Sequence, residues 1–79
     1  MTKLEEKLVE LSYKKEYRSR NKYVKHWRLC KLIICLHKEE IADFYIDVNI
    51  NIDSQQDLDI LQQAFNQLQN DLKELKEIE

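Results

Sequence analysis

Residues 41–52 read IADFYIDVNINI, and this stretch decides the fold because its apolar side chains recur at every second position. The apolar set is Phe44, Ile46, Val48, Ile50 and Ile52, with polar side chains and one tyrosine between them. A period of two is typical of a β-strand that buries one face. The stretch therefore predicts a strand over 41–52, within a sheet that has a covered side.

Two segments upstream predict the partners of this strand. Residues 30–36 (CKLIICL) are apolar and β-branched, which suits a more central strand. Only the polar residues 37–40 separate the two strands, so they should pair as a hairpin, with a four- or five-residue turn because no Asn-Gly or Asp-Gly is present. Residues 23–27 (YVKHW) predict a third strand, followed by a short turn at Arg28 and Leu29.

A helix is expected on each side of these strands. Residues 2–5 (TKLE) have the form of a capping box, and Leu4, Leu8 and Leu11 follow as one apolar stripe, which predicts a helix over about residues 2–13. Asp53 or Ser54 can cap a second helix that runs to Ile78. That helix would be roughly 36 Å long against about 20 Å for a six-residue strand, so it must overhang the sheet.

The sequence therefore predicts one small α+β domain over residues 1–79, with the order α-β-β-β-α. A three-stranded antiparallel sheet should pack against the long C-terminal helix. The expected core is Leu32, Ile34, Phe44, Ile46, Leu61, Phe65 and Leu68.

Apolar residues of the second helix follow a heptad pattern that permits two interpretations. They are Leu58, Leu61, Phe65, Leu68, Leu72 and Leu75, at spacings of three and four. Either the first helix covers the part of this stripe that the sheet leaves bare, or Leu68, Leu72 and Leu75 meet a second copy in a homodimer.

The composition excludes several function classes. The 79 residues include no glycine and no proline, where average usage gives about nine. Dinucleotide folds and phosphate loops need glycine, so both are excluded. The longest apolar run is residues 32–36, far below the roughly 20 residues of a membrane span, and the N-terminus has no signal-peptide core. We expect a cytoplasmic protein with no membrane partner.

No motif supports catalysis, a metal or a cofactor. Cys30 and Cys35 would lie on opposite faces of one strand about 16 Å apart, and a disulfide needs Cα atoms within about 7 Å. No spacing typical of zinc ligands connects them with the two histidines. Asp43 and Asp47 would share a face but lie about 13 Å apart, too far for a catalytic carboxylate pair. We expect a protein that is not an enzyme, with reduced cysteines and no cofactor.

Charge is distributed very unevenly. Residues 14–31 hold eight cations against one carboxylate, a balance of +7, whereas residues 32–79 hold three cations against eleven carboxylates, a balance of -8. Cations interleaved with aromatics suit a surface that binds phosphates and stacks bases. The candidate binding residues are Lys14, Lys15, Tyr17, Arg18, Arg20, Lys22, Tyr23, Lys25, Trp27, Arg28 and Lys31. The other interpretation is a solvated loop whose lysines protect a sheet edge.

An acidic face of the second helix is an alternative binding surface. It would carry Asp57, Asp59, Asp71, Glu74 and Glu77. Such a face can imitate a phosphate backbone against the basic cleft of a partner.

Residues 1–11 (MTKLEEKLVEL) and 54–75 (SQQDLDILQQAFNQLQNDLKEL) resemble a group of small phage and prophage proteins of low-GC Gram-positive bacteria. The resemblance covers the two helices and carries over no functional residue. It implies a phage accessory protein, and such proteins often block a host machine. The first hypothesis is therefore a non-catalytic protein that inhibits a bacterial defence or nucleic-acid-processing complex, as anti-CRISPR proteins do. The alternatives are a small DNA- or RNA-binding regulator that uses residues 14–31, and a dimeric structural or assembly protein.

Overall fold

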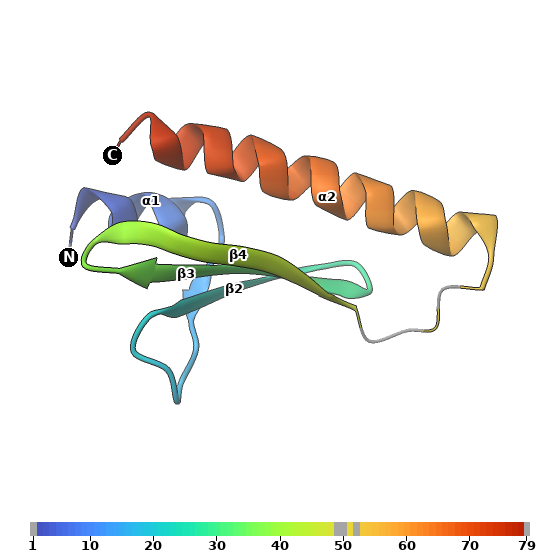
Figure 1. Cartoon of the computed structure of the whole chain (residues 1–79), viewed down its shortest axis with the longest axis horizontal. Helices are drawn as coiled ribbons and strands as arrows, with labels where there is room; N and C mark the ends of the chain where they lie inside the picture. Colours follow the sequence, from blue (N-terminus) through green and yellow to red (C-terminus); the bar gives the residue numbers. More distant parts are fainter. Residues whose placement is uncertain (1, 49–50, 52, 79) are drawn as a thin grey trace.

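The computed structural model describes residues 2–48, 51 and 53–78, and it has two helices and four strands in that part of the chain (Figure 1). In chain order they are α1 (Lys3–Glu10), β1 (Lys14–Lys15), β2 (Lys22–Trp27), β3 (Cys30–His37), β4 (Glu40–Val48) and α2 (Gln55–Lys76). The α+β class and the long C-terminal helix are confirmed. The strand expected over 41–52 ends at Val48, and its positions 49, 50 and 52 lie outside the described residues.

All four strands form one antiparallel sheet in the order β1-β2-β3-β4. The expected count of three strands is one too low, because Lys14 and Lys15 pair with Val24 and Tyr23. A strand of two adjacent lysines carries no alternation of apolar and polar residues, so the sequence pattern could not indicate it.

Both β-hairpins around β3 close with two-residue turns. Arg28 and Leu29 join β2 to β3, as expected, but Lys38 and Glu39 alone join β3 to β4, so the expectation of a four- or five-residue turn is wrong. Lys38 and Glu39 have φ angles of 52° and 66°, the φ pattern of a type I′ turn. This turn matches the twist of paired strands, and the hairpin accepts the steric cost of two left-handed residues without glycine.

Both predicted helix caps are present. The Glu5 amide donates to Thr2 Oγ1 at 3.2 Å, and the Asp57 amide donates to Ser54 Oγ at 3.2 Å. Helix α1 is shorter than expected, since it ends at Glu10 and the chain reverses at Ser12, where φ is 77°.

Helices α1 and α2 lie on the same side of the sheet (Figure 1). The even-numbered residues of β3 face them and are almost fully buried, including Leu32 and Ile34 at 0% exposure. The described core residues are Leu4, Leu8, Tyr13, Tyr23, Cys30, Leu32, Ile34, Leu36, Ala64, Leu68, Leu72 and Leu75. No described helix covers the opposite face of the sheet.

The buried face of α2 differs from the predicted heptad stripe. Phe65 is 49% exposed, and on β4 Phe44 is 48% exposed, so neither belongs to the core as expected. Ala64 is buried in place of Phe65, because a straight helix with 3.6 residues per turn drifts about 20° per heptad away from a 3.5-residue repeat.

The same geometry removes the predicted dimer contact. Leu68, Leu72 and Leu75 are buried against the sheet and α1 within one chain, so they cannot form a seam between two copies. Helix α2 is about 33 Å long at 1.5 Å per residue. It runs past the end of the sheet, as its length predicts (Figure 1).

Candidate functional site

Residues 14–22, here called the basic hairpin, project from the sheet on the side away from α2 (Figure 1). The hairpin consists of β1, a six-residue loop and the first residue of β2. Its loop is closed by the Glu16 amide, which donates to the Lys22 carbonyl at 2.8 Å. At its other end the Leu36 amide of β3 donates to the Asn21 carbonyl at 2.9 Å. The base of the loop is therefore attached to two strands.

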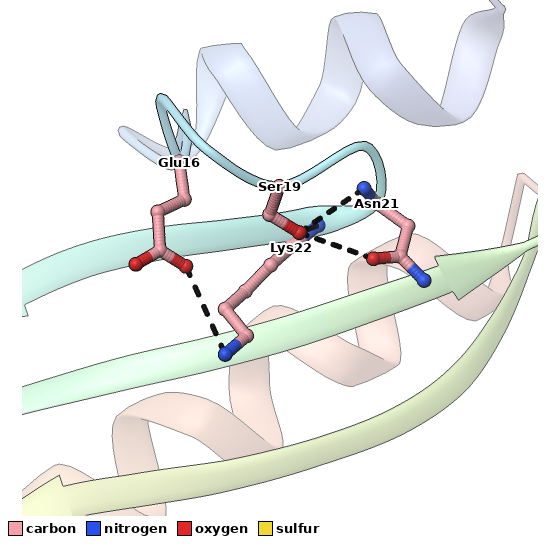
Figure 2. Close-up of polar contacts among 4 residues, drawn as sticks. All are labelled: Glu16, Ser19, Asn21 and Lys22. Atoms are coloured by element: carbon pink, nitrogen blue, oxygen red, sulfur yellow. Dashed lines mark hydrogen bonds and ion pairs between the residues drawn. The ribbon is translucent and has the colours of Figure 1, made fainter.

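Ser19 fixes the conformation of this loop (Figure 2). Its amide donates to the Glu16 carbonyl at 3.1 Å. Its Oγ accepts hydrogen bonds from the amides of Asn21 and Lys22 at 3.4 and 3.1 Å. The same hydroxyl donates a hydrogen bond to Asn21 Oδ1 at 3.2 Å. A Ser hydroxyl that satisfies nearby backbone amides in this way holds a turn in one conformation.

The fixed loop presents charge and one aromatic ring to solvent. Tyr17 is 96% exposed, and Arg18 beside it is exposed as well. Within the described part of the chain, no salt bridge involves Lys14, Lys15, Arg18 or Arg20. Lys22 is the exception in the hairpin, since its Nζ lies 3.8 Å from Glu16 Oε2. Four cations of the hairpin are thus available to an external anion.

A hollow of about 520 Å³ lies beside the hairpin, on the face of the sheet that the helices leave bare. Side chains that point away from the helices line it, from all four strands. They include Lys14, Lys22, Val24, His26, Lys31, Ile33, Tyr45 and Asp47. Four residues belong to both the basic hairpin and the hollow, namely Lys14, Lys15, Glu16 and Lys22, so the two features form one continuous surface.

Lys22 connects the hairpin to Tyr45 on β4. Its Nζ lies 5.9 Å from the centre of the Tyr45 ring. A hydrogen bond to Tyr45, followed by the charges of Tyr45 and Glu16, raises the pKa of Lys22 above its ordinary value. Lys22 is therefore a permanent cation at neutral pH.

Two residues that the sequence placed on the binding surface lie inside the protein. Tyr23 is buried in the core, and Lys25 points toward α2, where its Nζ lies 3.0 Å from Asp71 Oδ2. Both occupy positions of β2 that alternate with Lys22 and Val24, so the pleat directs them to the helices. Because basic and aromatic residues occur at both the odd and the even positions of this segment, its sequence does not indicate which of them face the helices.

Trp27 and Arg28 lie apart from the basic hairpin. Trp27 is half-buried and packs against the core, and the Arg28 guanidinium lies 5.2 Å from its ring at the β2–β3 turn. Lys31 is the remaining predicted cation, and it lines the hollow. The surface that the structure assembles therefore contains Lys14, Lys15, Tyr17, Arg18, Arg20, Lys22 and Lys31.

The predicted acidic face of α2 loses Asp71, which is 2% exposed. Its carboxylate accepts from Tyr13 Oη at 2.8 Å, Lys25 Nζ at 3.0 Å and Gln67 Nε2 at 3.0 Å. Asp71 is a core residue that joins α2 to the sheet. The other members of the face, Asp57, Asp59, Glu74 and Glu77, remain at least partly exposed.

Sequence reasoning did not select Ser19, His26, Ile33 or Tyr45. The period-two pattern did place Tyr45 on the polar side of β4, and this was the one available signal. Strand register brings Tyr45 opposite Ile33, and Ile33 opposite Val24. That register depends on the two turns, of which one was expected to be longer.

Comparison with protein-family models, curated proteins and solved structures finds no match to this chain. Among the described helices, none combines the length and apolar character needed to cross a bilayer. The two cysteines are free thiols, Cys30 buried on the helix side and Cys35 half-buried. In the described part of the chain, no group of three or more His, Cys, Asp or Glu residues is arranged to hold a metal ion.

Proposed function

We propose that this chain is a non-catalytic binding protein that attaches to the phosphate backbone of nucleic acid through the basic hairpin. The observation that carries this proposal is the exposed set Lys14, Lys15, Arg18 and Arg20 on the basic hairpin, whose loop is held in one conformation. Phosphate contacts from Lys and Arg release counterions, and this term supplies most of non-specific affinity for nucleic acid.

Tyr17 adds a second kind of contact at the tip of the hairpin. A tyrosine that is 96% exposed contributes almost nothing to the stability of its own chain. Next to Arg18 it can stack on a base or a sugar while the guanidinium meets a phosphate. Because Ser19 already fixes the loop, less conformational entropy is lost on binding.

The nucleic acid can be free or exposed in a host nucleoprotein complex. In the second case the protein would block that complex, as anti-CRISPR proteins do, and this is the setting implied by the resemblance to phage accessory proteins. The recognition chemistry of the hairpin is the same in both settings.

The test compares two variants that remove the same charge. Arg18→Ala/Arg20→Ala removes two cations from the hairpin, and Lys73→Ala/Lys76→Ala removes two exposed cations from α2. Fluorescence anisotropy with a labelled oligonucleotide at about 50 and 200 mM salt gives the affinity and its salt dependence. We expect the hairpin variant to bind more weakly, with a slope of log K against log salt reduced by about 2, and the α2 variant to bind like wild type.

One result would decide against direct binding to free nucleic acid, and another would decide against the hairpin as the binding site. One is the absence of oligonucleotide binding by the wild-type protein at 50 mM salt. The other is equal loss of affinity in both variants, which would show that net charge and not the hairpin governs binding. If wild type binds no free oligonucleotide but co-purifies with a host nucleoprotein complex in a way that needs Arg18 and Arg20, the inhibitor setting is supported.

A further inference from the structure

The hollow on the bare face of the sheet has an apolar floor, which a phosphate-binding surface does not require. Val24, Ile33 and Tyr45 lie side by side across β2, β3 and β4, because Ile33 pairs with Val24 on one side and with Tyr45 on the other. Ile33 is only 5% exposed although no described helix lies on this face. Longer side chains around it therefore stand as walls above this floor.

Those walls are mostly cationic. The hollow is lined by Lys14, Lys15, Lys22 and Lys31, together with His26 and the carboxylates of Glu16 and Asp47. Glu16 lies 3.8 Å from Lys22, and Asp47 is the partner of Lys31 across the β3–β4 pair. Four lysines against two carboxylates leave a positive balance.

We infer that the hollow binds one unpaired nucleotide, so that the substrate class of the proposed function is single-stranded nucleic acid. The base would lie against the Tyr45 ring and the floor of Ile33 and Val24, and its phosphates would meet the lysines. A volume of about 520 Å³ lies within the range of pockets for small ligands, roughly 300 to 1,000 Å³. In a duplex the bases are stacked on one another, and only an unpaired base can offer its ring face to an aromatic side chain.

The Tyr45 ring is available to such a base. It is 39% exposed, and the Lys22 ammonium lies 5.9 Å from its centre, at the outer limit of a cation–π contact. The flexible Lys22 side chain would exchange its hydrogen bond and ring contact with Tyr45 for a phosphate when a base arrives. Continuity with the basic hairpin through Lys14 and Lys22 would let one strand pass from the hollow to the loop.

This inference rests on the proposed function, and its test separates the two. Anisotropy is measured for a 12-nucleotide single strand and for a duplex of the same sequence, with wild type, Tyr45→Ala, Tyr45→Phe and Phe44→Ala. Phe44 is the matched control, because it is a neighbouring exposed aromatic residue that points to the other face of β4. Circular dichroism verifies that each variant is folded.

We expect wild type to prefer the single strand by about tenfold or more. Tyr45→Ala should weaken binding of the single strand by about tenfold, the contribution of one stacked base, while Tyr45→Phe and Phe44→Ala bind like wild type. As a measurement that needs no variant, titration of wild type with the single strand should shift the amide NMR signals of Val24, Ile33 and Tyr45.

Other outcomes overturn the inference. Equal affinity for strand and duplex, or wild-type binding by Tyr45→Ala, would show that the hollow holds no base. If Arg18→Ala/Arg20→Ala still weakens binding in that case, the proposed function of the hairpin remains supported although the inference about the hollow is wrong. The absence of any oligonucleotide binding by wild type would overturn this inference and also direct binding to free nucleic acid, and it would leave only the setting of a host nucleoprotein complex.

Discussion

At the scale of single residues, Asp71 organises the interior of the protein. Three donors from three segments reach its carboxylate: Tyr13 before β1, Lys25 on β2 and Gln67 one turn earlier on α2. The Lys25 ammonium also lies 5.3 Å from the centre of the Tyr13 ring. A buried carboxylate is stable only when such donors replace the water it has lost. Asp71 thus fixes the rotation of α2 on the sheet.

Removal of Asp71 should destabilise the protein strongly. In Asp71→Ala the Lys25 ammonium and the Tyr13 hydroxyl lose their partner while they remain largely buried, and breaking a buried ion pair costs about 3 kcal/mol or more. Urea denaturation measures this loss. The control is Glu74→Ala, an exposed carboxylate on the same helix, which should change the free energy of unfolding by less than about 0.5 kcal/mol. Similar losses in the two variants would contradict the role of Asp71.

Tyr13 makes the stability of the protein sensitive to alkaline pH. Burial, and then the hydrogen bond and the charge of Asp71, raise the pKa of Tyr13 well above its ordinary value. The folded protein therefore keeps the Tyr13 proton at pH values where the unfolded chain loses it, near pH 10. Stability from this source is fully present below that pH. Above it, the free energy of unfolding should fall by up to about 1.4 kcal/mol per pH unit.

Two phenylalanine variants test this pH dependence. Tyr13→Phe lacks the Tyr13 hydroxyl and so the proton that the folded protein retains there, and its free energy of unfolding should therefore fall less between pH 9 and pH 11 than that of wild type. Tyr17→Phe removes a tyrosine that is 96% exposed and should retain the wild-type decline. Denaturation curves across this pH range give the comparison, and an equally steep decline in Tyr13→Phe would exclude Tyr13 as the source.

At the scale of the elements, the sequence predicted each regular segment that has a hydrophobic period. The alternation in β4, the apolar run of β3 and the Thr2 and Ser54 caps are local signals, and the structure contains all of them. What failed depends on packing. The lysine pair of β1 becomes a strand only through its pairing with β2, and Lys38 and Glu39 form a tight turn only because the strand twist requires it.

The candidate site could be predicted in part, for the same reason. Charge density pointed to residues 14–31, and the exposed cations of the hairpin lie there. The pleat of β2 then divides the segment between two faces, so that Lys25 enters the core while Lys22 lines the hollow. Ile33 and Tyr45 meet only through the register of β3 and β4, which no local pattern determines.

The rotation of α2 about its axis predicts that two large apolar residues of this helix contribute very differently to the free energy of unfolding. Leu68 is 3% exposed in the core, whereas half of the Phe65 surface faces solvent. Leu68→Ala should cost about 2 to 5 kcal/mol in the free energy of unfolding, because a cavity replaces the buried side chain. Phe65→Ala should cost about 1 kcal/mol or less, in contrast to the core position that the heptad pattern indicates. Chemical denaturation of the two variants decides it, and a larger loss for Phe65→Ala would show that the heptad stripe faces the core.

At the scale of the whole molecule, the fold separates the two signs of charge. The basic hairpin and helix α2 lie at opposite sides of the sheet, along a direction in which the Cα atoms extend over 27 Å (Figure 1). Charges further apart than a Debye length, about 8 Å at physiological salt, are largely screened from each other. The net charge of -2 therefore does not describe the field that an approaching nucleic acid meets at the hairpin.

This separation predicts that the acidic residues of α2 have little effect on the affinity for nucleic acid. Asp59→Asn/Glu74→Gln/Glu77→Gln changes the net charge by three, from -2 to +1, yet leaves every residue of the hairpin and the hollow in place. If the local field governs binding, the affinity of this variant for a single-stranded oligonucleotide at about 150 mM salt should remain within about twofold of wild type, because screening isolates the far side. If the summed charge of the molecule governed binding, the change of three charges in this variant would strengthen binding at least as much as the change of two charges in Arg18→Ala/Arg20→Ala weakens it. A large gain in affinity on neutralising α2 at about 150 mM salt, where screening separates the two sides of the molecule, would therefore contradict a local hairpin site.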